Sequence, residues 1–146
     1  MSRTLAREDA FKLIFEMEIT KISADDALDY LYETAENENE MWAQSTVSEE
    51  NKKYLETVIR GVDKNREILN AKISPLLKGW TIERISKVNL SLLQLAFYEI
   101  DFIDDIPLKV SANEAVQLAK KYGGSESGSF INGVLGAYIK SKSVEE

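Results

Sequence analysis

Cysteine and histidine are both absent from the 146-residue sequence. Their absence excludes disulfide bonds, thiolate chemistry and zinc sites built from these two residue types. It also removes the side chain best suited to proton transfer near neutral pH, so any catalysis would depend on carboxylates, lysine or tyrosine. A chain of this length can nevertheless bury a real interior, either as one domain or as two small subdomains that share a core.

The sequence also lacks segments for targeting, membrane insertion and common enzyme chemistry. The amino terminus, MSRTLARED, has no apolar run of the kind found in signal peptides, and no segment is long enough for a membrane helix. No glycine-rich phosphate loop follows a strand, and there is no nucleophile elbow. The acidic residues between positions 25 and 50 form a solvated face rather than a converging catalytic pair. We therefore expect a cytoplasmic protein that is not an enzyme and that needs no metal or cofactor.

Negative charge is concentrated in one segment of the chain. The net charge is −7, from 18 lysines and arginines and 25 aspartates and glutamates. Between Ile22 and Asn51 there are nine acidic residues and no basic ones, so the remainder carries 16 acids against 18 bases. A basic face elsewhere is therefore compatible with the acidic total, and nucleic acid is not excluded as a partner.

Residues 80–102, WTIERISKVNLSLLQLAFYEIDF, form the stretch around which the chain is organised. Within it, residues 89–100 are mostly apolar and contain neither glycine nor proline. This run is longer than a usual buried strand, and its leucine, glutamine, alanine and glutamate favour helix. A helix that is apolar on most of its circumference must be surrounded by other elements. We therefore predict the central helix of a bundle, with Trp80 in the core.

Helical periodicity predicts further helices on both sides of this stretch. They cover residues 4–19, 23–35, 48–73 and 111–122, and a last helix begins near 127. The pairs Ser23–Asp26 and Ser111–Glu114 have the spacing of capping boxes at two of these starts, and Ser48 is the expected cap of a third. No period-two pattern typical of strands appears. The predicted fold class is all-α.

Two arginines stand at the start of the first predicted helix. Cations at a helix amino terminus are disfavoured by the macrodipole, so Arg3 and Arg7 are mildly out of place there. One interpretation is ordinary surface charge, with Arg7 paired to a nearby acid. The other is an arginine patch held for a phosphate backbone, with Lys12 downstream. The residues alone leave both interpretations open.

Longer motifs follow one another in a fixed order. They are RTLAREDAF (3–11), WTIERI (80–85), LLQLAFYEI (92–100), IPLKVSANEAVQLAKKYG (106–123) and FINGVL (130–135). In this order, and at this length, the sequence resembles the NusB family of transcription antitermination factors from end to end. The resemblance implies about seven helices in two packed helical subdomains, residues 1–79 and 80–146.

The resemblance also implies a function and partners. Proteins of this family bind the single-stranded boxA element of nascent RNA as a heterodimer with NusE, a ribosomal protein of the small subunit. The complex links the RNA to elongating RNA polymerase and suppresses termination, chiefly on ribosomal RNA operons. No reaction is catalysed. Both monomers and homodimers occur among such proteins, and the sequence does not decide between them.

The same resemblance assigns RNA-binding residues. They are Arg3, Arg7 and Lys12 near the amino terminus, and Ser127, Phe130, Asn132 and Gly133 at the start of the last helix. Phe130 could stack on a base or belong to the core, Ser127 and Asn132 could read bases, and Gly133 would let the RNA backbone approach. Thr4 and Leu5 stand where the family often has extra basic residues, so we expect weak RNA binding without NusE.

Two alternatives stay open at the level of sequence. Some ribosomal RNA cytosine methyltransferases carry a NusB-like domain ahead of the catalytic one. The 146 residues contain no Rossmann-like site for a methyl donor, so this alternative would require further sequence. The other alternative is a helical protein-interaction module that has lost RNA binding, in which substitution of Arg3 and Arg7 would leave RNA affinity unchanged.

Overall fold

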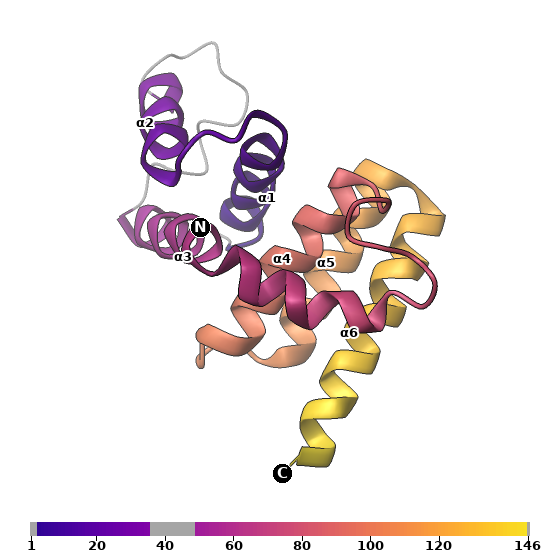
Figure 1. The fold of residues 1–146 in the computed structure, drawn as a ribbon. Coiled ribbons are helices and arrows are strands. Elements are labelled where there is room, and N and C mark those ends of the chain that lie inside the picture. Colours follow the sequence, from indigo (N-terminus) through magenta and orange to yellow (C-terminus); the bar gives the residue numbers. More distant parts are fainter. Residues whose placement is uncertain (1–2, 36–48, 146) are drawn as a thin grey trace. The chain divides into compact units, whose positions relative to one another are not determined.

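The computed structural model describes residues 3–35 and 49–145, and these residues form helices joined by short connections (Figure 1). The elements are α1 (Arg3–Thr20), α2 (Ala24–Ala35), α3 (Glu49–Ile73), the short 3-10 helix η2 (Ser74–Leu76), α4 (Lys87–Phe102), α5 (Leu108–Gly123) and α6 (Ser125–Glu145). No strand occurs within the described ranges, so the all-α prediction is confirmed. Within the described residues, no helix combines the length and the hydropathy that a membrane span requires.

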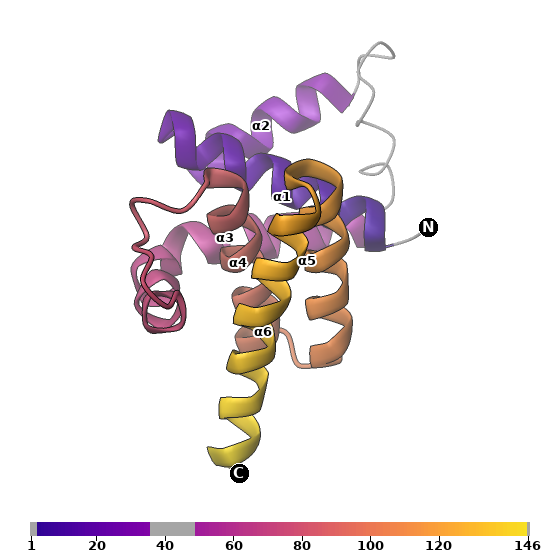
Figure 2. The same ribbon diagram turned by 90° about the vertical axis from the view of Figure 1, so that its right-hand side faces the viewer.

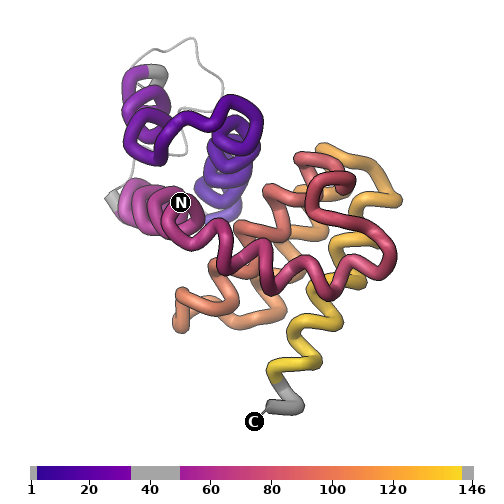
Figure 3. Tube along the Cα trace, viewed as in Figure 1, coloured from indigo at the N-terminus to yellow at the C-terminus, as the bar shows by residue number. Residues whose placement is uncertain are grey.

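The chain divides into two compact units, which are called here the amino-terminal unit (Met1–Lys64) and the carboxy-terminal unit (Asn65–Glu146). The division falls inside α3, where Asn65 departs from helical geometry with φ −106° and ψ 15°. Figure 3 traces the continuous path of the chain through α3. The boundary expected from the resemblance, after Gly79, lies further along the chain.

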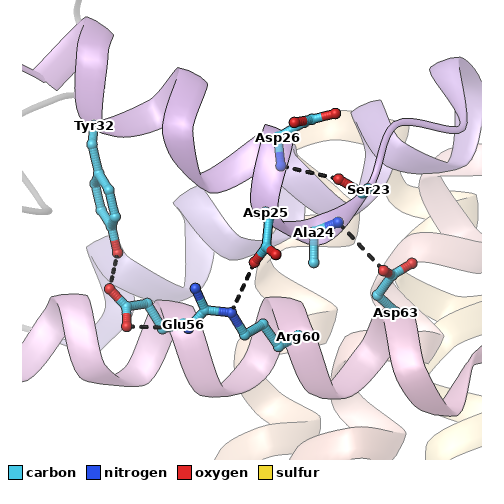
Figure 4. A network of polar contacts seen from close by, with 8 residues as sticks. All are labelled: Ser23, Ala24, Asp25, Asp26, Tyr32, Glu56, Arg60 and Asp63. Carbon is cyan, nitrogen blue, oxygen red and sulfur yellow. Dashed lines mark hydrogen bonds and ion pairs between the residues drawn. The ribbon is translucent and has the colours of Figure 1, made fainter.

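In the amino-terminal unit, α2 begins at the predicted cap. The backbone N–H of Asp26 donates to Ser23 Oγ at 3.1 Å, and the N–H of Ala24 donates to Asp63 Oδ2 of α3 at 3.3 Å (Figure 4). These two bonds satisfy backbone donors that a helix leaves open at its first turn. The core is apolar and fully buried, formed by Ala10, Leu13, Ile14, Met17, Leu28, Leu31, Leu55, Val58 and Ile59.

Part of the acidic segment is neutralised within this unit. Asp25 on α2 accepts a hydrogen bond from Arg60 Nε on α3 at 3.2 Å, and Arg60 also contacts Glu56 at 3.3 Å (Figure 4). The hydroxyl of Tyr32 donates to Glu56 at 2.7 Å. Asp25 of α2 therefore faces a cation on α3. Exposed pairs of this kind contribute little each to stability, about 0–1 kcal/mol.

The carboxy-terminal unit is built around α4, as the apolar run predicts. Residues 90–100 of α4 are all buried, and the hydroxyl of Ser86 caps the helix by accepting from Asn89 N at 3.1 Å. Both α5 and α6 pack against α4, and they also lie side by side with each other (Figure 2). The prediction of a central helix over residues 89–100 is confirmed.

Two local expectations are wrong. The Ser111–Glu114 pair does not begin a helix, because α5 starts at Leu108 with Pro107 as its N-cap residue. Ser111 lies inside the helix and donates to buried Glu99 Oε1 at 2.8 Å, so its hydroxyl satisfies an acid of α4 instead of a helix end. Trp80, expected in the core, is 56% exposed. Ser48, the expected cap of α3, lies outside the described residues.

Candidate nucleic-acid interface

The two arginines of α1 lie over the same aromatic ring. The guanidinium carbon of Arg3 is 4.8 Å from the ring centroid of Tyr54 on α3, and that of Arg7 is 5.9 Å away. Both distances are within the range of cation–π attraction. The structure thus brings Arg3 and Arg7 together within the amino-terminal unit, and Tyr54 is the residue that joins them.

These cations differ in their exposure. Arg7 is only 3% exposed, so it is not ordinary surface charge. Arg3 and Lys12 are partly exposed and can reach a ligand in solvent. Direct phosphate contact is therefore open to Arg3 and Lys12, whereas Arg7 contributes its positive charge from a buried position.

A buried acid lies next to these cations in the sequence of α1. Asp9 is 3% exposed, and its Oδ2 has no hydrogen-bond partner within the described part of the chain. Burial raises the pKa of Asp9 to about 7, an effect that Lys12 opposes and Glu8 reinforces. Near neutral pH a large fraction of Asp9 is therefore uncharged, which limits how far it cancels the positive charge of the helix start.

In the carboxy-terminal unit, two adjacent hollows flank the exposed ring of Trp80. The larger has a volume of about 540 Å³ and the smaller about 270 Å³. Trp80 and Phe130 line both of them. The larger hollow is also lined by Tyr122, Arg84, Asn89, Glu126 and Ser127, and the smaller by Ser129 and Gly133. Aromatic faces, a cation and polar groups are therefore gathered in one place.

The predicted residues of α6 take different positions around these hollows. Phe130 is partly exposed and lines both, so its ring is accessible for stacking. Gly133 is exposed, and the space above its Cα is open. Asn132 is exposed but lines neither hollow. Ser127 is buried and its hydroxyl donates to Asn89 Oδ1, so it orients Asn89 and holds the wall of the larger hollow.

The sequence profile of the NusB family matches residues 4–140. The chain belongs to the NusB family. It is 44% identical over 142 residues to the transcription antitermination protein NusB of Acetivibrio thermocellus, a match that covers 97% of this chain and 91% of the relative. The resemblance drawn from the motifs is confirmed, and the chain is matched over nearly its whole length.

Solved structures carry the same fold. The structure of T. maritima NusB has a TM-score of 0.81 at 32% identity and covers 96% of this chain and 92% of the other. A structure of the antitermination factors NusB and NusE in complex with dsRNA has a TM-score of 0.77 and covers 95% and 96%. Its identity to this chain is 22%, so that likeness concerns the fold alone.

Three residues of the candidate interface in this NusB-family chain are not recognisable from the sequence. They are Trp80, Arg84 and Tyr54. The sequence pattern assigns Trp80 to the core because large apolar residues are usually buried. In the sequence, Arg84 is recognisable only as a charged residue beside the central helix. Tyr54 lies among the apolar positions of α3 and carries no sequence signal that separates a platform for cations from a core residue. Trp80 and Arg84 lie in the connection between η2 and α4, so no helical spacing in the sequence places them together.

Proposed function

We propose that this chain is a transcription antitermination factor that binds boxA-type single-stranded RNA together with NusE. In this proposal it links the RNA to elongating RNA polymerase in the cytoplasm, chiefly on ribosomal RNA operons, and catalyses no reaction. The observation that carries the proposal is the pair of accessible rings, Trp80 and Phe130, which line the same hollows beside Arg84. Single-stranded RNA is held by stacking of its bases on such rings and by cation contacts to phosphate.

Membership of the family supports the choice of partners. The relative from Acetivibrio thermocellus is named an antitermination protein, and a NusB of the same fold is found in complex with NusE and dsRNA. The partly exposed cations Arg3 and Lys12 supply phosphate contacts in the amino-terminal unit. Thr4 and Leu5 stand where the family often has extra basic residues, and each phosphate contact adds to affinity and to its salt dependence. We therefore expect weak binding by the protein alone and tighter binding once NusE contributes its own surface.

The proposal is tested by fluorescence anisotropy of a labelled boxA RNA. The protein is titrated with and without NusE at two salt concentrations, and a scrambled RNA of equal length serves as the specificity control. We expect salt-sensitive binding that tightens with NusE and is lost with the scrambled sequence. Absence of binding under all conditions would contradict the proposal and leave a helical protein-interaction module.

A variant pair locates the RNA path. Trp80→Ala removes an exposed ring from the hollows, whereas Phe102→Ala removes a ring of similar exposure at the far end of α4. Loss of one stacked base costs about 1–3 kcal/mol. We expect Trp80→Ala to weaken RNA binding about five- to a hundredfold, in line with that cost, and Phe102→Ala to bind as the unmodified protein does. Equal affinities for the two variants would show that bases do not stack at Trp80.

A further inference from the structure

Tyr54 occupies an unusual position between the two arginines of α1. Its ring is 5% exposed, yet the guanidinium groups of Arg3 and Arg7 both approach it, at 4.8 Å and 5.9 Å from the centroid. Tyr54 comes from α3, and the arginines come from the first two turns of α1. The contact therefore joins two helices of the amino-terminal unit through two of its cations.

The start of α1 needs such a contact for electrostatic reasons. The first turn of α1 contains no acidic residue, although a helix amino terminus is stabilised by negative charge and destabilised by cations. The negative face of an aromatic ring attracts a guanidinium group and offsets part of this cost. Two like charges that lie near one ring also repel each other, so the ring has to hold them in place.

A ring holds an arginine differently from a carboxylate. A carboxylate would neutralise the charge and engage the N–H donors of the guanidinium group. An aromatic face contacts the flat side of the group, so the N–H donors at its edge and its full charge stay available to a phosphate. Within the described residues, Arg3 forms no ion pair, and its interaction with Tyr54 is the one that fixes its guanidinium group.

We propose that Tyr54 is a positioning residue for RNA binding, because its ring fixes the guanidinium group of Arg3 beside that of Arg7 without neutralising the charge of Arg3. This inference rests on the proposed function, since it concerns how that RNA is recognised. Tyr54 touches no RNA itself in this scheme. Its ring sets the arrangement of the cations, and its hydroxyl is not required for that role.

The inference is tested with three variants. Tyr54→Leu removes the ring, Tyr54→Phe keeps the ring and removes the hydroxyl, and Ile59→Ala damages the same core from a buried position on the same helix. Thermal unfolding measures the loss of stability in each variant. Anisotropy titrations with boxA RNA and NusE, at several salt concentrations and well below the unfolding temperature, measure RNA affinity and its salt dependence.

We expect Tyr54→Leu to weaken RNA binding roughly three- to tenfold, from the strength of one or two cation–π contacts. The plot of log affinity against log salt should also become shallower, by about 0.7 for each phosphate of the single-stranded RNA that an arginine no longer neutralises. Tyr54→Phe should keep the RNA affinity and the slope of its salt dependence within about twofold of those of the unmodified protein. Ile59→Ala should lower the unfolding temperature yet leave the salt dependence unchanged, because a core defect alone removes no cation.

Two results would overturn the role of Tyr54 while RNA binding by the unmodified protein stands. One is unchanged affinity and salt dependence in Tyr54→Leu, and the other is an equal loss in Tyr54→Phe or Ile59→Ala. Absence of RNA binding by the unmodified protein, with and without NusE, would overturn the proposed function and with it this inference. NMR of the free protein adds a direct check. The δ-methylene protons of Arg3 should show an upfield ring-current shift that Tyr54→Leu abolishes and Tyr54→Phe keeps.

Discussion

The hydroxyl of Tyr138 on α6 lies 2.7 Å from both carboxylate oxygens of Asp101 at the end of α4. Lys72 Nζ on α3 and Lys142 Nζ on α6 contact the same carboxylate at 2.7 Å and 2.9 Å. The ring of Tyr138 also stacks on Phe97, with 4.0 Å between the ring centroids. Three helices of the carboxy-terminal unit thus meet at one buried acid, which fixes α6 against α4.

Removal of the Tyr138 hydroxyl should destabilise this junction without disturbing the stacked rings. Tyr138→Phe leaves a carboxylate that is 5% exposed without one of its donors, and the missing hydrogen bond to a charged group is worth roughly 1–3 kcal/mol. We expect the free energy of unfolding, measured by urea denaturation, to fall by that amount. Tyr122→Phe, on an exposed tyrosine of α5, is the control and should change stability by less than about 0.5 kcal/mol. Equal losses in the two variants would mean that the Asp101 contact contributes nothing.

Asp101 should make stability depend on acid pH. Burial alone would raise the pKa of Asp101, but hydrogen bonds from Lys72, Tyr138 and Lys142 outweigh it and hold the pKa below its usual value. The stabilisation is therefore complete above the ordinary aspartate pKa, and it is lost as the pH falls below about 4. Asp101→Asn should be less stable than the unmodified protein at pH 7 and approach it at pH 3. A constant difference across urea titrations from pH 3 to pH 7 would contradict this assignment.

Asp9 should produce a pH dependence of the opposite sign. Its pKa of about 7 lies above the ordinary value of 3.8, so the folded protein binds a proton there more tightly than the unfolded chain does. Its contribution favours folding below pH 4 and is lost as the pH rises through 7. Asp9→Asn should therefore raise stability at pH 8 by roughly 1–4 kcal/mol and leave it nearly unchanged at pH 4. Asp29→Asn, at an exposed acid of α2, is the control. A variant less stable than the parent at pH 8 would show that the ionised carboxylate of Asp9 is favoured in the folded state.

Substitutions at two glycines of α6 distinguish an effect on helix stability from an effect on RNA affinity. A Cβ at Gly133 or at Gly136 would meet nothing within 4 Å, but only Gly133 lines a hollow beside Trp80 and Phe130. Replacement of glycine by alanine in a helix gains about 0.5–1 kcal/mol. Gly133→Ala and Gly136→Ala should therefore both raise the unfolding temperature. If RNA backbone passes close to Gly133, only Gly133→Ala should also weaken boxA binding, and equal RNA affinities would place the RNA elsewhere.

Much of the fold could be predicted because its signals are local. The apolar run of residues 89–100 requires a surrounded helix wherever it lies, and α4 is buried along that length. Ser23 caps α2 as its spacing indicates. The Ser111–Glu114 pair has an equally good pattern and failed, because Pro107 starts the helix earlier and Glu99 needs a buried donor. A capping pattern predicts where a helix could begin. Whether the serine hydroxyl of that pattern caps the helix depends also on the groups that a neighbouring helix places beside it.

The helical class, the order of the helices and, through the ordered motifs, the family can all be inferred from the amino-acid sequence alone. These properties depend on hydrophobic periodicity and on residue identity, and both can be read directly from the linear sequence. The exposure of Trp80 beside Phe130, and the contact of Arg3 and Arg7 with the ring of Tyr54, are visible in the folded protein and not in the sequence. Burial and cation–π contact depend on which side chain from a distant segment packs against a residue, and the periodicity within one helix does not carry that information.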